Sequence, residues 1–362
     1  MSARPILIMA GGTGGHVYPA LAVAHALQAR SQAVVWLGTE RGFEARVVPA
    51  AGIDIEWVSI SGLRRKGLIA LLLAPLQIGW ALLQSLAVIL RRRPAAVLGM
   101  GGFASGPGGV AAWLTRRPLV IHEQNAVAGM TNRLLARLAR VVLQAFPGSF
   151  NSSISAETVG NPVREDIAAV PPPHERYAGR VGALRVLVLG GSQGALALNR
   201  TVPAALALLA EDVRPAVRHQ CGERTLDLAR AAYAEHDVDV ELLPFIDDMA
   251  AAYAWADLVI CRAGALTIAE LCAVGVPALF VPYPAAVDDH QTANARPMAD
   301  AGAATIIAES ELTPEHLAGL LREWLQSRAE LQQRAARARA LSTPDALRRI
   351  TDVCLEQAGA CA

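Results

Sequence analysis

The amino-acid sequence predicts an α/β protein with two doubly wound, parallel-sheet domains that face one cleft. Along the 362 residues, short apolar runs alternate with helical patterns, as they do where helices cover buried parallel strands. The alternation stops at three prolines, residues 171–173, and then begins again. Each half opens with a strand, a glycine-rich turn and a helix, at residues 6–16 and 186–195. The length also suits two domains.

The apolar runs locate the expected strands in chain order. In the first half they are residues 5–10, 33–38, 55–60, 95–99, 118–122 and 140–145. In the second half they are residues 184–190, 238–243, 258–261 and 278–282. The first helix should bury a stripe formed by Val17, Ala20, Leu21, Ala24 and Leu27. From about residue 313 the chain is expected to be all helix.

The composition argues against several classes of protein. The chain has 33 Lys and Arg against 32 Asp and Glu, so its net charge does not suggest a nucleic-acid partner. Its single lysine, Lys66, follows no G-x-x-x-x-G pattern, which excludes a Walker A loop. The five cysteines and eight histidines lack C-x-x-C and H-E-x-x-H spacing, so no metal site is expected. The N-terminal apolar run is too short for a secretory signal.

Three glycine-rich loops follow predicted strands, at residues 11–16, 99–109 and 190–195. Glycine lets the backbone approach a ligand closely, and the start of the next helix offers unpaired N–H groups. A diphosphate suits such a site best. A tight turn without a ligand is the alternative for any one loop, but three loops favour binding. A nicotinamide site is poorly supported, because GGTGGH at the first turn is not G-x-G-x-x-G.

Polar side chains cluster beside these loops. Residues 122–125, HEQN, close a strand where ligands bind, unless they form a solvated turn. Glu270 suits the vicinal hydroxyls of a ribose, unless it is an exposed helix glutamate. Residues 288–295, DDHQTANA, suit sugar hydroxyls, helix capping or both. His16 is the best general-base candidate by residue type, since the reference pKa of histidine is ~6.5; a helix-capping histidine is the alternative.

Taken together, the motifs resemble those of the MurG family, the N-acetylglucosaminyltransferases of peptidoglycan synthesis. GGTGGH, GMGGFASGPGG, HEQN, GNPVR, GGSQGA, CRAGALTIAE and DDHQTANA occur in that family's order and spacing, across essentially the whole chain. The resemblance implies a GT-B fold with two Rossmann-like domains. It implies inverting transfer of GlcNAc from UDP-GlcNAc to the C4 hydroxyl of lipid I, the undecaprenyl-diphospho-MurNAc-pentapeptide, giving lipid II and UDP. No cofactor and no metal are implied.

The resemblance also implies the domain roles. Residues 1–162 would bind acceptor and membrane, with the C-terminal helix at 341–362 packed back on them, and residues 163–340 would bind UDP-GlcNAc. The implied substrate-binding residues are Thr13, Gly14, Gly15, Asn125, Arg164, Ser192, Ile246, Ala265, Leu266, Thr267, Ile268, Ala269, Glu270 and Gln291. Among them, Ser192 would bind the diphosphate, Ile246 would lie against uracil and Gln291 would bind the GlcNAc hydroxyls. Gly101, Gly102 and Phe103 would face the acceptor, and the catalytic base would be His16 or, second, Glu123.

An uncharged, largely apolar segment at residues 68–90 is long enough to span a membrane. It lies between two predicted strands of one sheet, where a crossover helix belongs, and its basic flanks are equal. We therefore expect one or two helices, broken near Pro75, that are partly buried against the sheet and partly dip into lipid through Leu72, Leu76 and Trp80. Ordinary core helices are the alternative. Trp113, Lys66 and Arg137 are expected alongside, with the basic residues meeting anionic headgroups.

The expected protein is peripheral, on the cytoplasmic side of the cell membrane. Its expected partners are UDP-GlcNAc, lipid I, anionic lipids and other cell-wall synthesis proteins, without nucleic acid. Two alternatives stay open. A UDP-sugar epimerase of similar two-domain fold would have no use for the apolar segment. A non-catalytic, membrane-bound nucleotide-binding module would bind UDP but release none from the donor.

Overall fold

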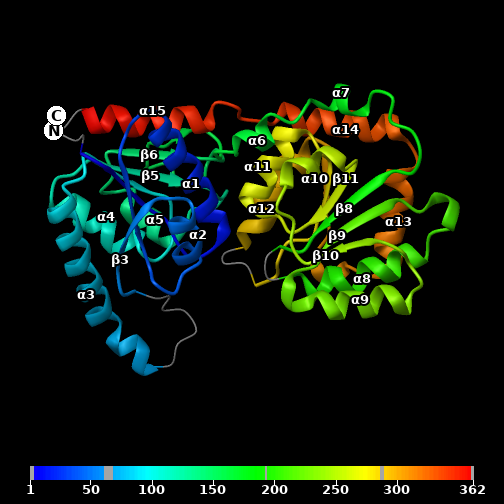
Figure 1. The fold of residues 1–362 in the computed structure, drawn as a ribbon, viewed down its shortest axis with the longest axis horizontal. Coiled ribbons are helices and arrows are strands. Elements are labelled where there is room, and N and C mark those ends of the chain that lie inside the picture. Colours follow the sequence, from blue (N-terminus) through cyan, green and yellow to red (C-terminus); the bar gives the residue numbers. More distant parts are fainter. Residues whose placement is uncertain (1–3, 61–67, 192–193, 286–288, 360–362) are drawn as a thin grey trace. The chain divides into compact units, whose positions relative to one another are not determined.

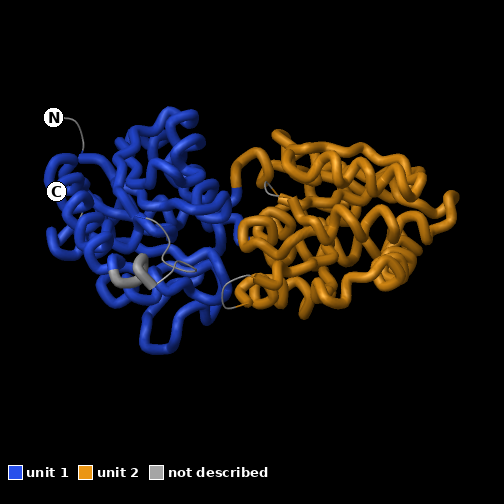
Figure 2. The backbone as a smooth tube through the Cα atoms, turned by 90° about the horizontal axis from the view of Figure 1, so that it is seen from below, with its two compact units in different colours: residues 1–163, 343–362 blue, residues 164–342 orange. Residues whose placement is uncertain are grey.

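The computed structural model describes residues 4–60, 68–191, 194–285 and 289–359, and only the backbone of residues 68–72. The chain forms two compact units, Met1–Val163 with Thr343–Ala362, and Arg164–Ser342 (Figure 2). These bounds differ by one or two residues from the expected domain bounds, whereas the binding roles assigned to the domains stay proposals. Ser192, Lys66 and the side chain of Leu72 lie outside the described residues.

The first unit is built on a parallel sheet of strand order β3-β2-β1-β4-β5-β6-β7. Its strands are β1 (Ile6–Met9), β2 (Val34–Gly38), β3 (Asp54–Trp57), β4 (Ala96–Gly99), β5 (Leu119–Glu123), β6 (Val141–Gln144) and β7 (Glu157–Thr158). The order of the first six strands is the doubly wound 3-2-1-4-5-6 arrangement. The central strands are apolar throughout because helices cover both faces.

Helices α1 (Gly14–Ala29), α2 (Glu44–Ala50) and α15 (Ala346–Gly359) cover one face of this sheet. The predicted stripe of α1 is buried, as expected. Ile350, Val353 and Cys354 of α15 join the same core, and α15 packs beside α1. The C-terminal helix thus belongs to the first unit, although it follows the second unit in sequence (Figure 1).

Helices α3 (Leu68–Arg92), α4 (Ser105–Leu114) and α5 (Met130–Leu135) cover the opposite face. The prediction of a break near Pro75 is wrong: α3 continues through this proline. A proline removes one helical hydrogen bond, and here helix continues on both sides of it. Ala81, Val88 and Ile89, in the C-terminal half of α3, are buried in the core, which holds this half in place.

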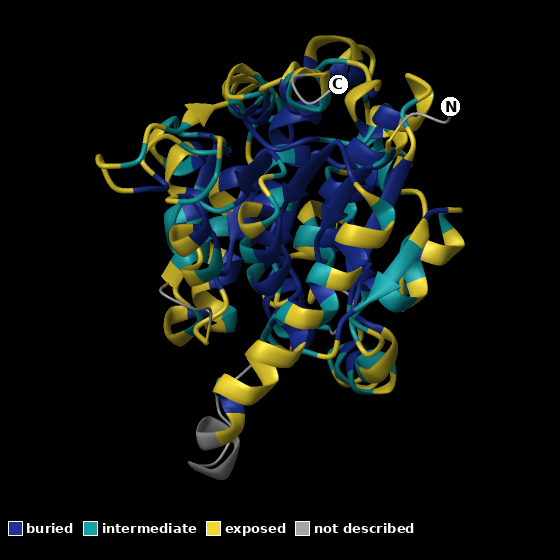
Figure 3. Cartoon of the chain, turned by 90° about the vertical axis from the view of Figure 1, so that its left-hand side faces the viewer, coloured by how far each residue is buried: buried dark blue, intermediate teal, exposed yellow. Residues whose placement is uncertain are grey.

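Among the described helices, the Leu73–Arg92 part of α3 is long and apolar enough to cross a membrane. Only 28% of its most apolar window is buried within the protein. Figure 3 shows the exposed half of this helix projecting from the unit. Because α3 connects β3 and β4 of one sheet and packs on α4, it occupies the place of a crossover helix.

The second unit repeats the same strand order, β10-β9-β8-β11-β12-β13, in a second parallel sheet. The strands are β8 (Arg185–Leu189), β9 (Ala216–Gln220), β10 (Glu241–Leu243), β11 (Leu258–Cys261), β12 (Ala278–Phe280) and β13 (Ala304–Ile306). The apolar runs predicted β8, β10, β11 and β12. They did not predict β9 or β13.

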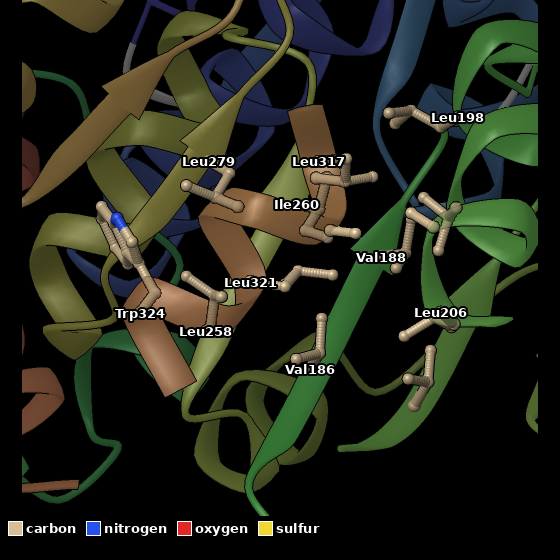
Figure 4. Packing of buried hydrophobic residues seen from close by; sticks show 14 of the residues in the cluster. Val186, Val188, Leu198, Leu206, Leu258, Ile260, Leu279, Leu317, Leu321 and Trp324 are labelled. Atoms are coloured by element: carbon tan, nitrogen blue, oxygen red, sulfur yellow. The ribbon is translucent and has the colours of Figure 1, made fainter. Parts of the chain in front are cut away.

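Helices surround this second sheet. They are α6 (Glu165–Ala168), α7 (Pro173–Tyr177), α8 (Leu196–Ala207), α9 (Leu226–Glu235), α10 (Met249–Trp255), α11 (Ala265–Val274), α12 (His290–Asp300), α13 (Pro314–Leu325) and α14 (Arg328–Ala340). Val186, Val188 and Ile260 of the sheet pack against apolar residues of α8 and α13 (Figure 4). This core fixes the positions of the loops that leave β8 and β11.

Candidate active site

Each unit has a topological switch point, where the strand order reverses. In the first unit it lies between β1 and β4, and in the second between β8 and β11. In open parallel sheets, ligands bind at the carboxyl ends of the strands beside such a point. Three of the four loops that follow these strands contain the predicted glycine-rich motifs, and the fourth, residues 262–264, leads into α11. The topology therefore places the sequence motifs where ligand binding is expected.

Two glycine loops of the first unit pack directly against each other. Gly12, Gly101 and Gly102 have φ values of 95°, 96° and 88°, which favour glycine. A Cβ atom on Gly102 would collide with the backbone of Gly11, and one on Gly101 would lie 2.9 Å from Nδ1 of His16. The loop after β4 therefore fixes both the loop after β1 and the ring of His16.

Glu44 anchors the first of these loops from behind. This carboxylate is fully buried. Its Oε2 accepts a hydrogen bond of 3.0 Å from the backbone N–H of Gly12, and Oε1 accepts from the N–H and hydroxyl of Thr39. The sequence prediction missed Glu44 because it lies on α2, in no motif.

His16 begins a chain of hydrogen-bonding groups that runs into the interior. Its Nδ1 lies 2.9 Å from Oε1 of Gln124. Nε2 of Gln124 lies 3.1 Å from Nδ1 of His122, and Nε2 of His122 lies 2.9 Å from the carbonyl oxygen of Gly160. Burial lowers the pKa of His122 to about 4, so its ring is neutral at pH 7. His16 does not cap α1, since its ring bonds to Gln124 instead.

Glu123 is buried and its carboxylate is fully engaged. Oε1 accepts hydrogen bonds from the backbone N–H and side-chain amide of Asn125. Oε2 accepts from the backbone N–H of Gly129 and the side-chain amide of Asn132. Four donors occupy the acceptor positions of a carboxylate, which suits an anchor for the 124–129 turn. A solvated turn, the alternative for HEQN, is excluded because His122, Glu123 and Gln124 are each 1% exposed or less.

The other predicted residues of the first unit lie on the same loops. Thr13 is the N-cap of α1 and is exposed, and Gly14 and Gly15 form the first turn of that helix. Phe103 lies in the second glycine loop, directly after Gly102, and is 51% exposed. Asn125 is held by Glu123 at the end of β5. The structure therefore brings the first-unit candidates to one edge of one sheet.

In the second unit, Gln220 at the end of β9 braces the glycine loop after β8. Its Oε1 accepts a hydrogen bond of 2.9 Å from Gly191 N–H, and its Nε2 donates to the carbonyl oxygens of Gly191 and Pro244. Gly194 has a φ of 74° and packs against the backbone of Cys221. The sequence analysis missed Gln220 because it missed β9.

Glu270 is a buried member of α11, only 6% exposed, so the alternative of an exposed helix glutamate is wrong. Its Oε2 accepts a 2.9 Å hydrogen bond from the hydroxyl of Tyr253. Its Oε1 lies 3.6 Å from the guanidinium of Arg164. Burial raises the pKa of Glu270 to about 6, although Arg164 and Tyr253 act in the opposite direction. This carboxyl therefore titrates near neutral pH.

The start of α11 is the predicted backbone-binding segment. Gly264 is its N-cap and has no side chain to cap the first N–H groups. Ala265, Leu266, Thr267, Ile268 and Ala269 form the first turns, upstream of Glu270. Arg262 supports this turn: it donates to the carbonyl oxygens of Val281 and Pro282 and pairs with Glu309 at 2.5 Å.

Gln291 and Ile246 lie on two other loops of the second unit. Oε1 of Gln291 accepts a 2.8 Å hydrogen bond from the Tyr283 N–H, which leaves its NH₂ group as the donor for a ligand. Ile246 follows β10 in the segment that leads to α10, beside Phe245, which is 45% exposed. Asp289 is the N-cap of α12, and it accepts a hydrogen bond from the Thr292 hydroxyl rather than from the helix backbone.

Among the described residues, no group of three or more His, Cys, Asp or Glu side chains is arranged to hold a metal ion. The sequence D-V-D at residues 237–239 resembles a metal-binding D-x-D motif, but it precedes β10 and so lies at the amino end of the strands, opposite the glycine loop of this unit. Two doubly wound parallel-sheet domains, each with a glycine loop at its switch point, form the GT-B fold of glycosyltransferases.

Comparison with known proteins identifies the family within this class. The N-terminal and C-terminal domains of glycosyltransferase family 28 match residues 6–144 and 185–350. A UDP-N-acetylglucosamine–N-acetylmuramyl-(pentapeptide) pyrophosphoryl-undecaprenol N-acetylglucosamine transferase from Alkalilimnicola ehrlichii is 61% identical, over 98% of this chain and 99% of its own. One of the same name from Marinobacter nauticus is 55% identical, over 98% of each.

A crystal structure of Acinetobacter baumannii MurG is 42% identical, with a TM-score of 0.85, and covers 98% of this chain and 99% of its own. The chain therefore belongs to the MurG family of glycosyltransferases. A UDP-N-acetylglucosamine 2-epimerase from Listeria monocytogenes has a TM-score of 0.65 at 16% identity. This likeness concerns the fold alone, which the epimerase alternative was expected to share.

Proposed function

We propose that the chain transfers GlcNAc from UDP-GlcNAc to the C4 hydroxyl of lipid I, with inversion at the anomeric carbon, and releases lipid II and UDP. The observation that carries this proposal is the 61% identity, along nearly the full length, to a transferase named for this reaction. The residue roles below come from the family resemblance, and the site geometry supports them where it is cited.

His16 is the proposed general base. In this step the acceptor hydroxyl gives its proton to the ring, its oxygen attacks C1 of GlcNAc, and the bond from C1 to the diphosphate oxygen breaks. His16 lies at the switch point and is partly exposed, and its ring forms no ion pair with the residues that the structure describes. Glu123 is the weaker candidate because four N–H donors already occupy its oxygens.

The second unit is the proposed donor site. The carboxylate of Glu270 would accept hydrogen bonds from the ribose hydroxyls through Oε1, with Arg164 beside it. Backbone N–H groups at the start of α11 and in the 190–195 loop, which contains Ser192, would bind the diphosphate. Their oriented dipoles stabilise charge that grows on the leaving group, the role that a metal ion plays in other enzymes. Gln291 would donate to GlcNAc hydroxyls, and Ile246 would lie against uracil.

The first unit is the proposed acceptor side. Gly101, Gly102 and Phe103 would face the acceptor, because their loop supports His16 directly. Thr13, Gly14, Gly15 and Asn125 would complete the donor site from this unit.

We also propose that the first unit binds the membrane surface, which is where a lipid-linked acceptor is found. Large apolar side chains are exposed on α3, α4 and α5, the helices that cover one face of the sheet. Those proposed to contact lipid are Leu73, Leu76, Ile78, Trp80, Leu83, Trp113, Leu114, Met130 and Leu134. Leu90 is also exposed, but it lies at the C-terminal end of α3 beside the paired Arg91 and is not part of this surface. Exposed apolar surface next to basic residues is typical of interfacial binding.

The basic residues near this face divide into two groups. Arg91 and Arg92 form ion pairs with Glu56, at 2.5 and 2.6 Å, so they contribute less to headgroup binding than their sequence position suggests. Arg137 and Arg140 instead line a surface cavity of about 670 Å³. Glu157 on the same wall is already paired with Arg349, which leaves this cavity positive and suits anionic headgroups.

Two variants test the choice of base. His16→Gln should lower kcat about 10²- to 10⁴-fold, the usual contribution of general-base catalysis. Glu123→Gln should lower stability instead, because an amide NH₂ would face N–H donors, while kcat per folded molecule changes only a few-fold. UDP release with a lipid I analogue measures kcat, and urea unfolding measures the folded fraction. If Glu123→Gln loses kcat as His16→Gln is expected to, at unchanged stability, the assignment is reversed.

A further inference from the structure

A second question about His16 is which ring nitrogen carries its proton. A neutral imidazole has one N–H donor and one lone pair, and only the nitrogen with the lone pair can accept a proton. Nδ1 of His16 faces Oε1 of Gln124. The bonding of Gln124 and His122 therefore decides the matter.

The far end of the chain fixes the tautomer of His122. Its Nε2 lies 2.9 Å from the carbonyl oxygen of Gly160. A carbonyl oxygen can only accept, so Nε2 of His122 must be the protonated nitrogen. Because the buried ring is neutral, its Nδ1 has a lone pair and must accept from Gln124.

A separate contact fixes the side-chain amide of Gln124. The amide end that faces His122 Nδ1 also lies 3.2 Å from the backbone carbonyl oxygen of His122. This end must be the NH₂ group, since two carbonyl oxygens cannot bond to each other. The oxygen of Gln124 consequently faces His16, in agreement with the argument from Gly160.

We propose that Gln124 and His122 are positioning residues that hold His16 in the tautomer protonated at Nδ1, so that Nε2 presents the lone pair that accepts the proton of the acceptor hydroxyl. The catalytic part of this proposal rests on the proposed function. After proton transfer, His16 Nδ1–H continues to donate to Gln124, and the bond strengthens because the donor is then charged. A glutamine supplies this orientation without adding a negative charge beside the base.

The first experiment reads the tautomers directly, in the protein without substrates. A long-range ¹H–¹⁵N correlation spectrum of ¹⁵N-histidine-labelled protein separates Nδ1-protonated from Nε2-protonated rings, with His16→Gln used to assign the His16 signals. The expected result is Nδ1 protonation for neutral His16 and Nε2 protonation for His122. Nε2 protonation of His16 in the unaltered protein would overturn the proposal.

The second experiment breaks the relay, which is the hydrogen-bond chain from His122 through Gln124 to His16. Gln124→Met keeps the length of the side chain but cannot accept from His16, so the ring should change to Nε2 protonation and kcat should fall at least tenfold. The matched control is Gln144→Met, which removes another buried glutamine, on the neighbouring strand β6, whose NH₂ donates to Thr158. It should leave the His16 tautomer and kcat unchanged.

The outcomes of Gln124→Met separate the two proposals. If the tautomer is unchanged, the relay is wrong. If the tautomer changes but kcat does not, the relay holds and His16 is not the base. Should Gln124→Met fail to fold, Gln124→Glu carries the test. Its carboxylate stabilises the His16 imidazolium, so the acid limb of the kcat–pH profile should shift to higher pH by about 1 unit or more. An acid limb that does not shift contradicts the relay.

Discussion

At the scale of single residues, Glu270 shows how burial determines the charge of a binding group. Its pKa is raised to about 6 because the carboxyl is removed from water, despite the nearby Arg164. The ionised form predominates above this pH, and an ionised carboxylate is the stronger acceptor for hydroxyl groups. Binding of UDP-GlcNAc through Glu270 should therefore depend on pH near 6, where most carboxylates are already fully ionised.

We expect the KM for UDP-GlcNAc to rise several-fold as the pH falls through about 6, the pKa of Glu270, because protonation weakens the bonds to ribose. Glu270→Gln should raise KM at pH 8 and abolish most of this pH dependence. UDP-GlcNAc is the correct probe, since the terminal phosphate of UDP itself titrates near ~6. A variant that retains the full pH dependence of the unaltered protein would exclude Glu270 as its source.

Residue type and motif order were enough to nominate His16, Glu123 and Glu270 from the sequence. They could not separate the roles of His16 and Glu123, because that difference depends on which hydrogen-bond donors and acceptors the fold brings to each side chain. Gln124 was noted only as part of HEQN, and Glu44 was missed. Both act through contacts with residues distant in sequence, 108 positions away for the Gln124–His16 pair and 32 for Glu44–Gly12.

At the scale of elements, the glycine loops of the first unit offer a matched pair of substitutions. Gly12 and Gly102 both have φ near 90°, but only Gly102 packs against backbone. Gly12→Ala should cost about 1 kcal/mol through backbone strain alone. Gly102→Ala should cost clearly more, since its Cβ must displace Gly11. Urea unfolding measures both free energies, and equal losses would contradict the close packing of the two loops.

The second prediction at this scale concerns membrane binding through the exposed side chains of α3. Replacing Leu76 or Trp80 with Asp should weaken binding to vesicles of anionic phospholipid about tenfold each, since burying such a side chain is worth about 1.5–3 kcal/mol. Leu90→Asp is the control: Leu90 is 64% exposed, similar to Leu76 at 72%, but lies at the end of α3 where Arg91 pairs with Glu56. Equal effects at Leu76 and Leu90 would place the membrane contact elsewhere.

Elements were predictable where apolar runs are uninterrupted. Strand β9 was missed because Arg218 and His219 interrupt its apolar pattern. His219 is nevertheless fully buried, where Nδ1 lies 2.8 Å from the hydroxyl of Tyr233, a partner that the sequence of the strand does not reveal. Helix α3 also continues through Pro75, where a break was expected, although its packed residues lie in its C-terminal half, so core packing does not explain this.

At the scale of the whole molecule, the two sheets share one strand order, 3-2-1-4-5-6 over their first six strands, and each carries candidate residues at its own switch point. The repeated strand–glycine turn–helix pattern was sufficient to predict two such domains. The return of α15 to the first unit came from the family resemblance, because no local pattern says which core Ile350 and Val353 join.

In the proposed reaction, this chain is a lipid I-dependent GlcNAc transferase that uses oriented backbone groups to stabilise the leaving diphosphate. The most direct test measures UDP release from UDP-GlcNAc, with and without a lipid I analogue, in the presence of EDTA. UDP release should require the acceptor and should survive chelation. UDP binding without release would leave only a nucleotide-binding module. Conversion of UDP-GlcNAc to another UDP-sugar without acceptor would instead identify an epimerase. Either result would exclude the proposed transferase reaction.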